Sequence, residues 1–150
     1  MTIPTSASWT DFAPVASNPI YLTKAAKSIR IKSNGKGCHF DYFTISAFNE
    51  EGEGRPTKQT GSFRTHILPV TIEAEDFDLG VNGSFSNDGK NNGGKYREKE
   101  TIDIYGDENR YYISINSGEF VNYTFDVEYE GTYKFSLASS SGGKIKVYFD

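Results

Sequence analysis

Residues 119–149 read EFVNYTFDVEYEGTYKFSLASSSGGKIKVYF, and this stretch decides the fold. Apolar and polar side chains alternate in three short runs: Glu119–Val127, Gly131–Ala138 and Lys144–Phe149. A period of two is typical of a strand that buries one of its faces. The turn residues Tyr129–Gly131 and Ser139–Gly143 separate the runs. The stretch therefore predicts three consecutive strands joined by turns.

Similar runs continue through the rest of the chain. Five more strands are predicted: Ser28–Lys32, Cys38–Phe48, Val70–Glu75, Thr101–Ile104 and Tyr111–Ile115. Helix is expected at most as a turn at Thr23–Lys27. Aromatic residues make up 15 % of the chain and it contains 15 glycines, a mixture that favours strands over helices. The sequence predicts an all-β fold built as a two-sheet antiparallel β-sandwich.

The strands fall into two blocks, residues 1–49 and 70–150. The stretch between them, residues 50–69, is polar, punctuated by Gly and Pro, and has no apolar period, so we interpret it as a linker. The first block alone has too few strands to cover its aromatic face. We therefore expect the two blocks to complete one domain that spans residues 1–150.

Composition argues against several classes of partner. The 16 basic and 20 acidic residues give a net charge of -4, and no cluster of Lys or Arg is interleaved with aromatic residues along the sequence. Nucleic acid is therefore not an expected partner. No apolar run reaches the roughly 20 residues of a membrane helix, so no membrane partner is expected. Cys38 is the only cysteine, and we expect it in the core.

Motifs in both blocks resemble one known family. The second block carries Thr71–Phe77 (TIEAEDF), Asn91–Arg97 (NNGGKYR), Ile102–Ile104, and Gly118–Val127 followed by Gly131–Tyr133. In this order they resemble the first half of family 6 carbohydrate-binding modules. The first block carries Ser8–Phe12 (SWTDF), Ile20–Leu22, Ser28–Ile31 and Cys38–Ile45, and it is similar to the second half of that family.

The resemblance implies a jelly-roll sandwich whose two halves run in circularly permuted order. A circular permutant, natural or engineered, and a slice across two tandem modules would both produce this order. Either origin places the beginning and the end of the chain in one hairpin, since surface hairpins tolerate new termini. We expect a monomer or a homodimer that exchanges halves.

The resemblance also implies a function. Family 6 modules bind polysaccharide without catalysis and hold a secreted glycoside hydrolase near its substrate, which raises effective concentration. The protein is thus expected to be extracellular as part of a larger secreted protein, although Met1–Pro4 has no signal peptide pattern. The alternative is a structural or adhesive sandwich with a degenerate sugar cleft. Members bind xylan, cellulose, laminarin, agarose or mannan, so the glycan is left open.

Glu73 and Glu75 are two residues apart, so on a strand they would share a face and repel each other. The resemblance implies a structural Ca²⁺ held by Glu73, Glu75, Asp41 and backbone carbonyls, and hard oxygen ligands suit this ion. Without the resemblance, a solvated strand edge would explain the two glutamates. A glycosidase pair needs an acid and a second carboxylate across a sugar, and no such cleft is evident, so we do not expect an enzyme.

The resemblance places the sugar site at one end of the sandwich. Trp9 matches a tryptophan that stacks on a sugar ring, and His39 stands where the family usually has Asn. The usual second aromatic is replaced by Ser114 or Ile115, and Tyr112 or Tyr96 could substitute for it. Without the resemblance, Trp9 could be a core residue and His39 a structural one. The sequence therefore predicts Trp9, His39, Tyr96 and Tyr112 as carbohydrate-binding residues.

Overall fold

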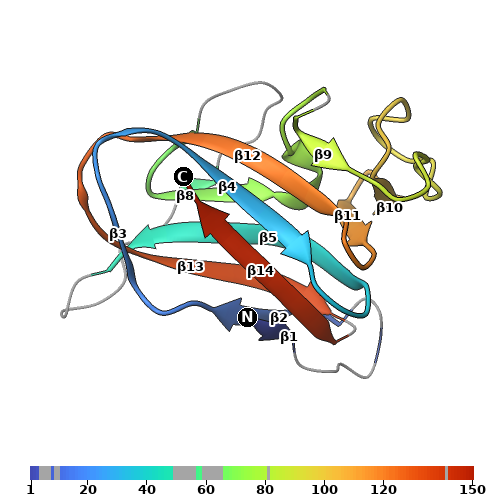
Figure 1. The fold of residues 1–150 in the computed structure, drawn as a ribbon, viewed down its shortest axis with the longest axis horizontal. Coiled ribbons are helices and arrows are strands. Elements are labelled where there is room, and N and C mark those ends of the chain that lie inside the picture. The colour runs from blue at the N-terminus through green and yellow to red at the C-terminus, as the bar shows by residue number, and fades with distance from the viewer. Residues whose placement is uncertain (4–7, 9–10, 49–56, 59–65, 81, 141) are drawn as a thin grey trace.

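The computed structural model describes residues 1–3, 8, 11–48, 57–58, 66–80, 82–140 and 142–150. These residues form fourteen strands and one short 3-10 turn, arranged as two sheets packed face to face (Figure 1). Almost all neighbouring strands are antiparallel. The two parallel pairs among the described residues are those of the short strands, β6 with β8 and β7 with β12. The protein is therefore an all-β sandwich, as the alternating apolar pattern predicts.

The front sheet is the one nearer the viewer in Figure 1. Its strand order is β1-β14-β4-β12-β7, and β9 also pairs with β12. Its strands are β1 (Thr2–Ile3), β4 (Ala25–Ser33), β7 (His66–Ile67), β9 (Ser84–Phe85), β12 (Phe120–Val127) and β14 (Gly143–Phe149).

The rear sheet has the order β10-β11-β5-β13-β2, with β3 on β13, β8 on β5 and β6 on β8. Its strands are β2 (Ala13–Ala16), β3 (Ile20–Leu22), β5 (Cys38–Ala47), β6 (Thr57–Lys58), β8 (Val70–Glu73), β10 (Asp103–Asp107), β11 (Arg110–Ile115) and β13 (Gly131–Ser140). The 3-10 turn η1 (Ala74–Asp76) follows β8 directly.

The core fills the space between the sheets with the alternate residues of each strand. Phe43 of the rear sheet meets Tyr123 of the front sheet edge to face, with ring centroids 4.7 Å apart, and Phe135 lies 5.3 Å from Phe43. Ile29 and Ile31 of β4 are fully buried beside them. Cys38 is also buried, as predicted, and burial raises the pKa of its thiol to about 12.

An irregularity in β5 changes which residues face the core. Its pairing with β13 shifts between Ala138, which lies opposite Tyr42, and Ser139, which lies opposite Phe40. Asp41 is therefore the extra residue of a β-bulge. Phe40 and Phe43 are both fully buried although they are three residues apart, because the bulge absorbs one residue. The bulge also aims Asp41 toward the edge of the rear sheet where β11 begins.

All eight strands predicted from the sequence are present, with shifts at their ends. The helical turn predicted at Thr23–Lys27 is wrong, because β4 already begins at Ala25 and pairs along its length with β12. The predicted strand Val70–Glu75 ends at Glu73, and Glu75 lies in η1. Of the predicted linker, residues 57–58 and 66–67 form β6 and β7, while 50–56 and 59–65 lie outside the described residues.

The two predicted blocks meet as one sandwich. β5 of the first block pairs with β8 of the second, with Tyr42 opposite Glu73, so the strand of Asp41 lies beside the strand of Glu73 as predicted. At the other side, β1 pairs with β14, with Thr2 opposite Lys144. The circularly permuted order of the halves, and its origin, stay predictions. Among the described residues no helix is long and apolar enough to cross a membrane.

Candidate functional site

Four aromatic side chains gather on the outer side of the rear sheet, and we call Phe12, His39, Tyr105 and Tyr112 the aromatic cluster. Tyr105 of β10 lies directly opposite Tyr112 of β11, and their stacked rings are 5.9 Å apart. The His39 ring of β5 lies 5.3 Å from Tyr112 and 6.2 Å from Tyr105. The Phe12 ring lies 5.5 Å from Tyr112 and is tilted by 58° to it. All four side chains are partly exposed.

The alternation of the strands places this cluster on the surface. Ile104, Ile113 and Phe40 are fully buried, so their neighbours in sequence, Tyr105, Tyr112 and His39, point to the opposite side. The hairpin between β10 and β11 turns at Glu108–Asn109, and Gly106, which lies opposite Tyr111 close to this turn, has a φ of 108°. A Cβ at Gly106 would lie 2.1 Å from the carbonyl oxygen of Arg110, so only glycine lets the strands approach this closely.

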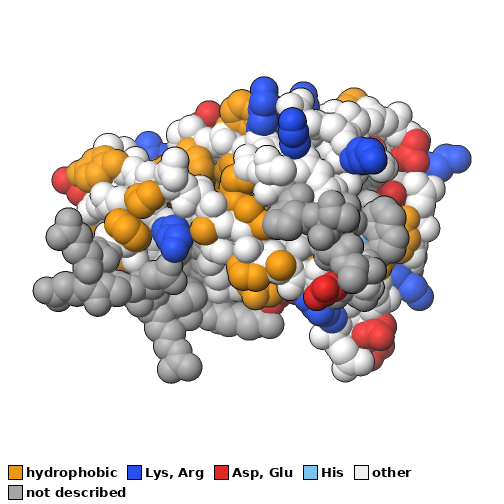
Figure 2. Space-filling view, turned by 90° about the horizontal axis from the view of Figure 1, so that it is seen from below, with side chains coloured by type: hydrophobic (Ala, Val, Ile, Leu, Met, Phe, Trp, Pro, Cys, Tyr) orange, Lys and Arg blue, Asp and Glu red, His pale blue; other side chains and the backbone are white. Residues whose placement is uncertain are grey.

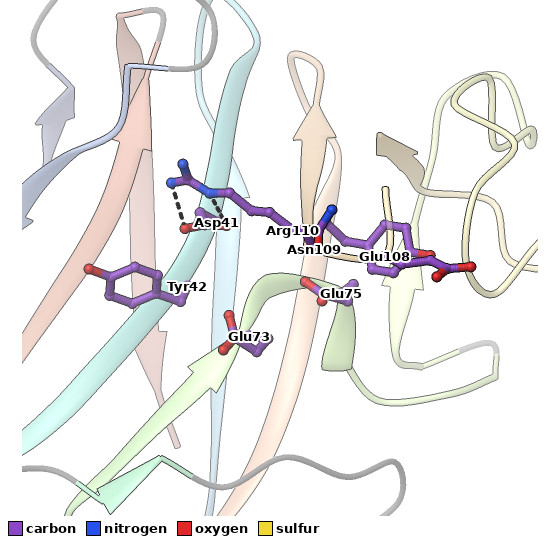
Figure 3. A pocket seen from close by; sticks show the side chains of 8 residues that line it. Asp41, Tyr42, Glu73, Glu75, Glu108, Asn109 and Arg110 are labelled. Atoms are coloured by element: carbon purple, nitrogen blue, oxygen red, sulfur yellow. Dashed lines mark hydrogen bonds and ion pairs between the residues drawn. The ribbon is translucent and has the colours of Figure 1, made fainter. Parts of the chain in front are cut away.

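Arg110 lies next to the cluster and joins it to a second feature of the rear sheet. Its guanidinium carbon lies 4.4 Å from the centre of the Phe12 ring. The same guanidinium donates two hydrogen bonds to Asp41, from Nε at 3.0 Å and from the terminal nitrogen at 2.8 Å (Figure 3). The Arg110 side chain is 50 % exposed and the Asp41 side chain 6 % exposed. The bidentate pair therefore compensates a nearly buried carboxylate.

A pocket of about 320 Å³ lies beside this pair, and we call it the acidic pocket. It is lined by Asp41, Tyr42, Glu73, Glu75, Glu108, Asn109, Arg110 and Tyr111. Figure 3 shows Glu73 at the end of β8 and Glu75 in the turn that follows, both on the side of the pocket. The structure thus brings together Asp41, Glu73 and Glu75, the three residues predicted to hold a metal ion.

Glu75 is the most perturbed acid of the pocket. It is buried, and its Oε2 atom has no hydrogen-bond partner among the described residues. Burial raises the pKa of the Glu75 carboxyl to about 7, and the nearby carboxylates Glu73, Asp76 and Asp41 also raise it, whereas a backbone hydrogen bond lowers it. This carboxylate is therefore poorly compensated when it is ionised.

A cation would suit this orphaned oxygen, but the pocket fits a metal only in part. Asp41 already accepts both hydrogen bonds from Arg110. Within the described parts of the chain, no group of three or more His, Cys, Asp or Glu side chains has the arrangement of a metal site. Calcium at this place would compete with Arg110 for the Asp41 oxygens, while Glu73 and Glu75 supply the remaining carboxylates.

Tyr96 lies near the acidic pocket and not in the aromatic cluster. Its ring stacks on Tyr111, which lines the pocket, at 5.1 Å, and its hydroxyl donates a hydrogen bond to Asp76. Its φ of 45° is rare for a residue with a side chain, so the contacts of this loop hold it in place. Tyr111 and Tyr112 are neighbours on β11 and point to opposite sides.

The sugar-binding residues predicted from sequence are therefore only partly brought together. His39 and Tyr112 meet in the aromatic cluster, Tyr96 lies apart, and Trp9 is outside the described residues. Sequence reasoning missed Tyr105, which the short β10–β11 hairpin places opposite Tyr112. Phe12, the last residue of the Ser8–Phe12 motif, is partly exposed and lies against Tyr112 and Arg110.

Glu119 is a further residue that sequence reasoning did not single out. It is 3 % exposed, and one carboxylate oxygen accepts hydrogen bonds from the backbone N–H of Asn87 and from the Ser86 hydroxyl. The other oxygen accepts a hydrogen bond of 2.7 Å from the backbone N–H of Asn116. Glu119 thereby fixes the turn before β12 and the loop after β9, so its role is structural.

Comparisons with protein-family models, with curated proteins and with solved structures found no match. The chemistry of the aromatic cluster and of the acidic pocket therefore carries the functional conclusion.

Proposed function

We propose that the protein is a non-catalytic carbohydrate-binding module and that the aromatic cluster is its sugar site. One observation carries this proposal: the rings of Tyr105, Tyr112 and His39 form a partly exposed layer on the sheet, with interplanar angles of 23° to 32°. Rings fixed on strands give a ligand contact area at little entropic cost, because the backbone beneath them is already ordered.

The chemistry of the cluster suits a sugar. The C–H faces of a sugar ring are apolar and pack on aromatic rings, while the hydroxyl rim needs hydrogen-bonding groups beside them. His39 and Arg110 supply such groups within and next to the cluster. Phe12 ties the cluster to the segment that carries Trp9, the tryptophan predicted to stack on the ligand. The resemblance to family 6 modules is the sole basis for including Trp9 in the proposed site.

Calcium is the second part of the proposal. We assign Glu73, Glu75 and Asp41 to a structural Ca²⁺, which would supply the positive charge that the acidic pocket lacks. The support is the buried Oε2 of Glu75 and the raised pKa of its carboxyl. Each ligand comes from the rear sheet or from the turn next to it, so the ion would tie β5 to η1.

The proposal places no reaction in the acidic pocket. A glycosidase needs one carboxylic acid and one carboxylate free to reach the sugar from opposite sides. Asp41 is bound to Arg110, and Glu75 is buried. Binding polysaccharide on behalf of a secreted glycoside hydrolase fits this arrangement better. In this account the permuted order of the halves and an exchanged dimer are questions of assembly, separate from the sugar site.

A glycan array probed with and without Ca²⁺ tests the proposal. The protein is expected to bind a neutral plant or algal polysaccharide with a dissociation constant in the micromolar to millimolar range, about 4 to 8 kcal/mol. The double variant Tyr105→Ala/Tyr112→Ala should lose this binding. The matched control Tyr21→Ala/Tyr129→Ala removes two exposed tyrosines that lie outside the cluster, and this variant should keep glycan binding.

Two outcomes would reject the proposal. If the cluster variant binds every glycan as well as the parent does, the aromatic cluster is not the site and a structural role replaces the binding one. If the parent releases new reducing ends from a bound polysaccharide, and Glu73→Gln or Glu75→Gln stops the release, the protein is an enzyme.

A further inference from the structure

The outer side of the front sheet carries a local excess of positive charge. Arg30 and Lys32 of β4 and Lys144 and Lys146 of β14 all point outward, because Ile29, Ile31 and Ile145 between them face the core. We call these four cations the basic face. Figure 2 shows Lys and Arg side chains along the upper edge of the molecule, the side on which β4 and β14 lie in Figure 1.

The register of the sheet sets how the four cations are spaced. Lys32 lies directly opposite Lys146, and Arg30 lies opposite Tyr148 on the same strand pair. Neighbouring strands are about 5 Å apart and alternate residues along a strand about 7 Å apart. The cations thus lie in two short rows at regular spacing. Within the described residues none of the three lysines forms an ion pair.

Arg30 is held in place by two contacts. Its guanidinium carbon lies 4.2 Å from the centre of the Phe120 ring, and its Nε donates a hydrogen bond of 2.9 Å to the Asn122 side chain. The two terminal nitrogens make no hydrogen bond within the described part of the chain. A guanidinium held in this way presents a planar pair of donors, which matches a carboxylate or sulfate group.

A shallow groove lies beside this arginine. It has a volume of about 230 Å³ and is lined by Arg30, Lys32, Tyr148 and Asp150. Asp150 is the acid of the lining, and its carboxylate accepts a hydrogen bond from the Ser28 hydroxyl. Tyr148 is 45 % exposed and forms a partly apolar wall. The groove therefore presents two cations and one aromatic wall to an anionic group, against the single carboxylate of Asp150.

We propose that the basic face binds an acidic polysaccharide through its sulfate or carboxylate groups. The chain as a whole has a net charge of -4. The basic face is therefore a local positive region on an acidic protein, and it is complementary to an anionic partner. The choice of a polysaccharide as the polymer rests on the proposed function. Single-stranded nucleic acid binds through several rings on which successive bases stack, and the groove offers one exposed ring, Tyr148, since Arg30 already covers Phe120.

Binding of the whole chain to dextran sulfate, measured by titration calorimetry at 50 mM NaCl, tests this proposal. Dextran without sulfate is the neutral control for the same backbone. Dextran sulfate is expected to bind at least tenfold more tightly than dextran, and binding should weaken at 300 mM NaCl because salt screens exposed charges. Equal binding of the two polymers would overturn the proposal.

Variants then locate the site. Lys32→Gln/Lys144→Gln/Lys146→Gln should weaken dextran sulfate binding at least tenfold. Lys24→Gln/Lys95→Gln/Lys99→Gln removes the same charge from exposed lysines outside the basic face and should leave binding within twofold. Arg30→Lys keeps the charge but loses the planar donor pair, so it should weaken binding several-fold. Equal losses in the two triple variants would show general attraction and overturn the assignment.

Two further measurements separate this proposal from the proposed function. Tyr105→Ala/Tyr112→Ala should keep dextran sulfate binding, and the basic-face variant should keep binding of any neutral glycan found on the array. If the aromatic variant alone loses dextran sulfate binding, the acidic polymer binds at the aromatic cluster and the basic face is not a site. If a single-stranded DNA of matched charge binds more tightly than dextran sulfate, the partner is nucleic acid and the choice of polysaccharide is wrong.

Discussion

The aromatic cluster and the acidic pocket are neighbours on the rear sheet, and Arg110 touches both of them. In the cluster, aromatic rings pack on one another. In the pocket, four carboxylates meet one guanidinium, and a buried oxygen of Glu75 has no partner among the described residues. Burial and the neighbouring carboxylates thus make ionised Glu75 unfavourable in the pocket although Arg110 is present there. Changes in the pocket should alter stability, and changes in the cluster should alter binding.

The largest change in the free energy of unfolding is expected when the pH is raised in the absence of metal. The folded-state pKa of Glu75, about 7, lies above its ordinary value of 4.5, so the folded protein holds a proton that the unfolded chain releases first. The contribution of Glu75 to stability is complete below pH 4.5 and is lost as pH rises through 7, by about 3 kcal/mol. Urea unfolding with a chelator between pH 5 and 8 measures this loss.

Glu75→Gln should flatten that pH dependence, because the amide keeps no ionisable proton. Glu108→Gln, an exposed acid on the same pocket, is the matched control and should behave as the parent does. The same pH dependence in Glu75→Gln and in the parent would show that the carboxylate is compensated in solution.

Calcium should stabilise the protein by a similar amount. An ion that binds only the folded state adds about 2.7 kcal/mol at a hundredfold excess over its dissociation constant. For a domain of this size, each kcal/mol raises the melting temperature by roughly 2 to 4 °C. Thermal unfolding with Ca²⁺, with Mg²⁺ and with a chelator measures the difference. A melting temperature that strong chelation leaves unchanged, or that Ca²⁺ still raises in Glu73→Gln/Glu75→Gln, contradicts the assignment.

Arg110→Met should cost about 2 kcal/mol in the metal-free protein, because it leaves the nearly buried Asp41 carboxylate without its partner. Asp41→Asn/Arg110→Met removes both charges and should recover most of this loss. Saturating Ca²⁺ should also recover it if the ion binds Asp41. Chemical unfolding of the three proteins measures these differences. Equal destabilisation of the single and double variants would show that loss of the ion pair does not explain the effect of Arg110→Met.

The smallest effect on stability is expected in the aromatic cluster. Tyr112 is partly exposed, and an aromatic pair contributes about 0.5 to 1.5 kcal/mol beyond its buried area. Tyr112→Ala should therefore change the free energy of unfolding by about 1 kcal/mol, while Tyr123→Ala, in the core, should cost about 3 to 5 kcal/mol. If both variants lose the same stability by chemical unfolding, Tyr112 is a core residue and not a binding one.

Alternation alone predicts most of the fold. The runs around Tyr123, Phe135 and Ile145 have the period of two that a strand with one buried face requires, and each became a strand. Thr23–Lys27 has no glycine or proline to exclude a helical turn, and long-range pairing with β12 decided its conformation instead. The end of β8 at Glu73 was missed for a similar reason, since η1 is held by the hydrogen bond from Tyr123 to Ala74.

The site is harder to predict because it combines residues that are distant in sequence. Asp41, Glu73 and Glu75 were predicted together from the resemblance, but Arg110, the partner of Asp41, has no marker in sequence. Tyr105 can be assigned to the aromatic cluster only once the register of the β10–β11 hairpin is known, because that register places it opposite Tyr112. The basic face has the same origin: Arg30–Lys32 and Lys144–Lys146 look unremarkable along the chain, and the pairing of β4 with β14 brings them together.

The central claim is that a neutral glycan binds on the aromatic cluster, and an NMR titration tests it most directly. The ¹⁵N-labelled protein is titrated with xylo-, cello- and laminari-oligosaccharides in Ca²⁺, and the amide shifts are followed. The account predicts that at least one of them shifts the amides of His39, Tyr105 and Tyr112 and leaves those of β4 and β14 unchanged. No shift with any of these sugars, or shifts confined to residues outside the cluster, would contradict it.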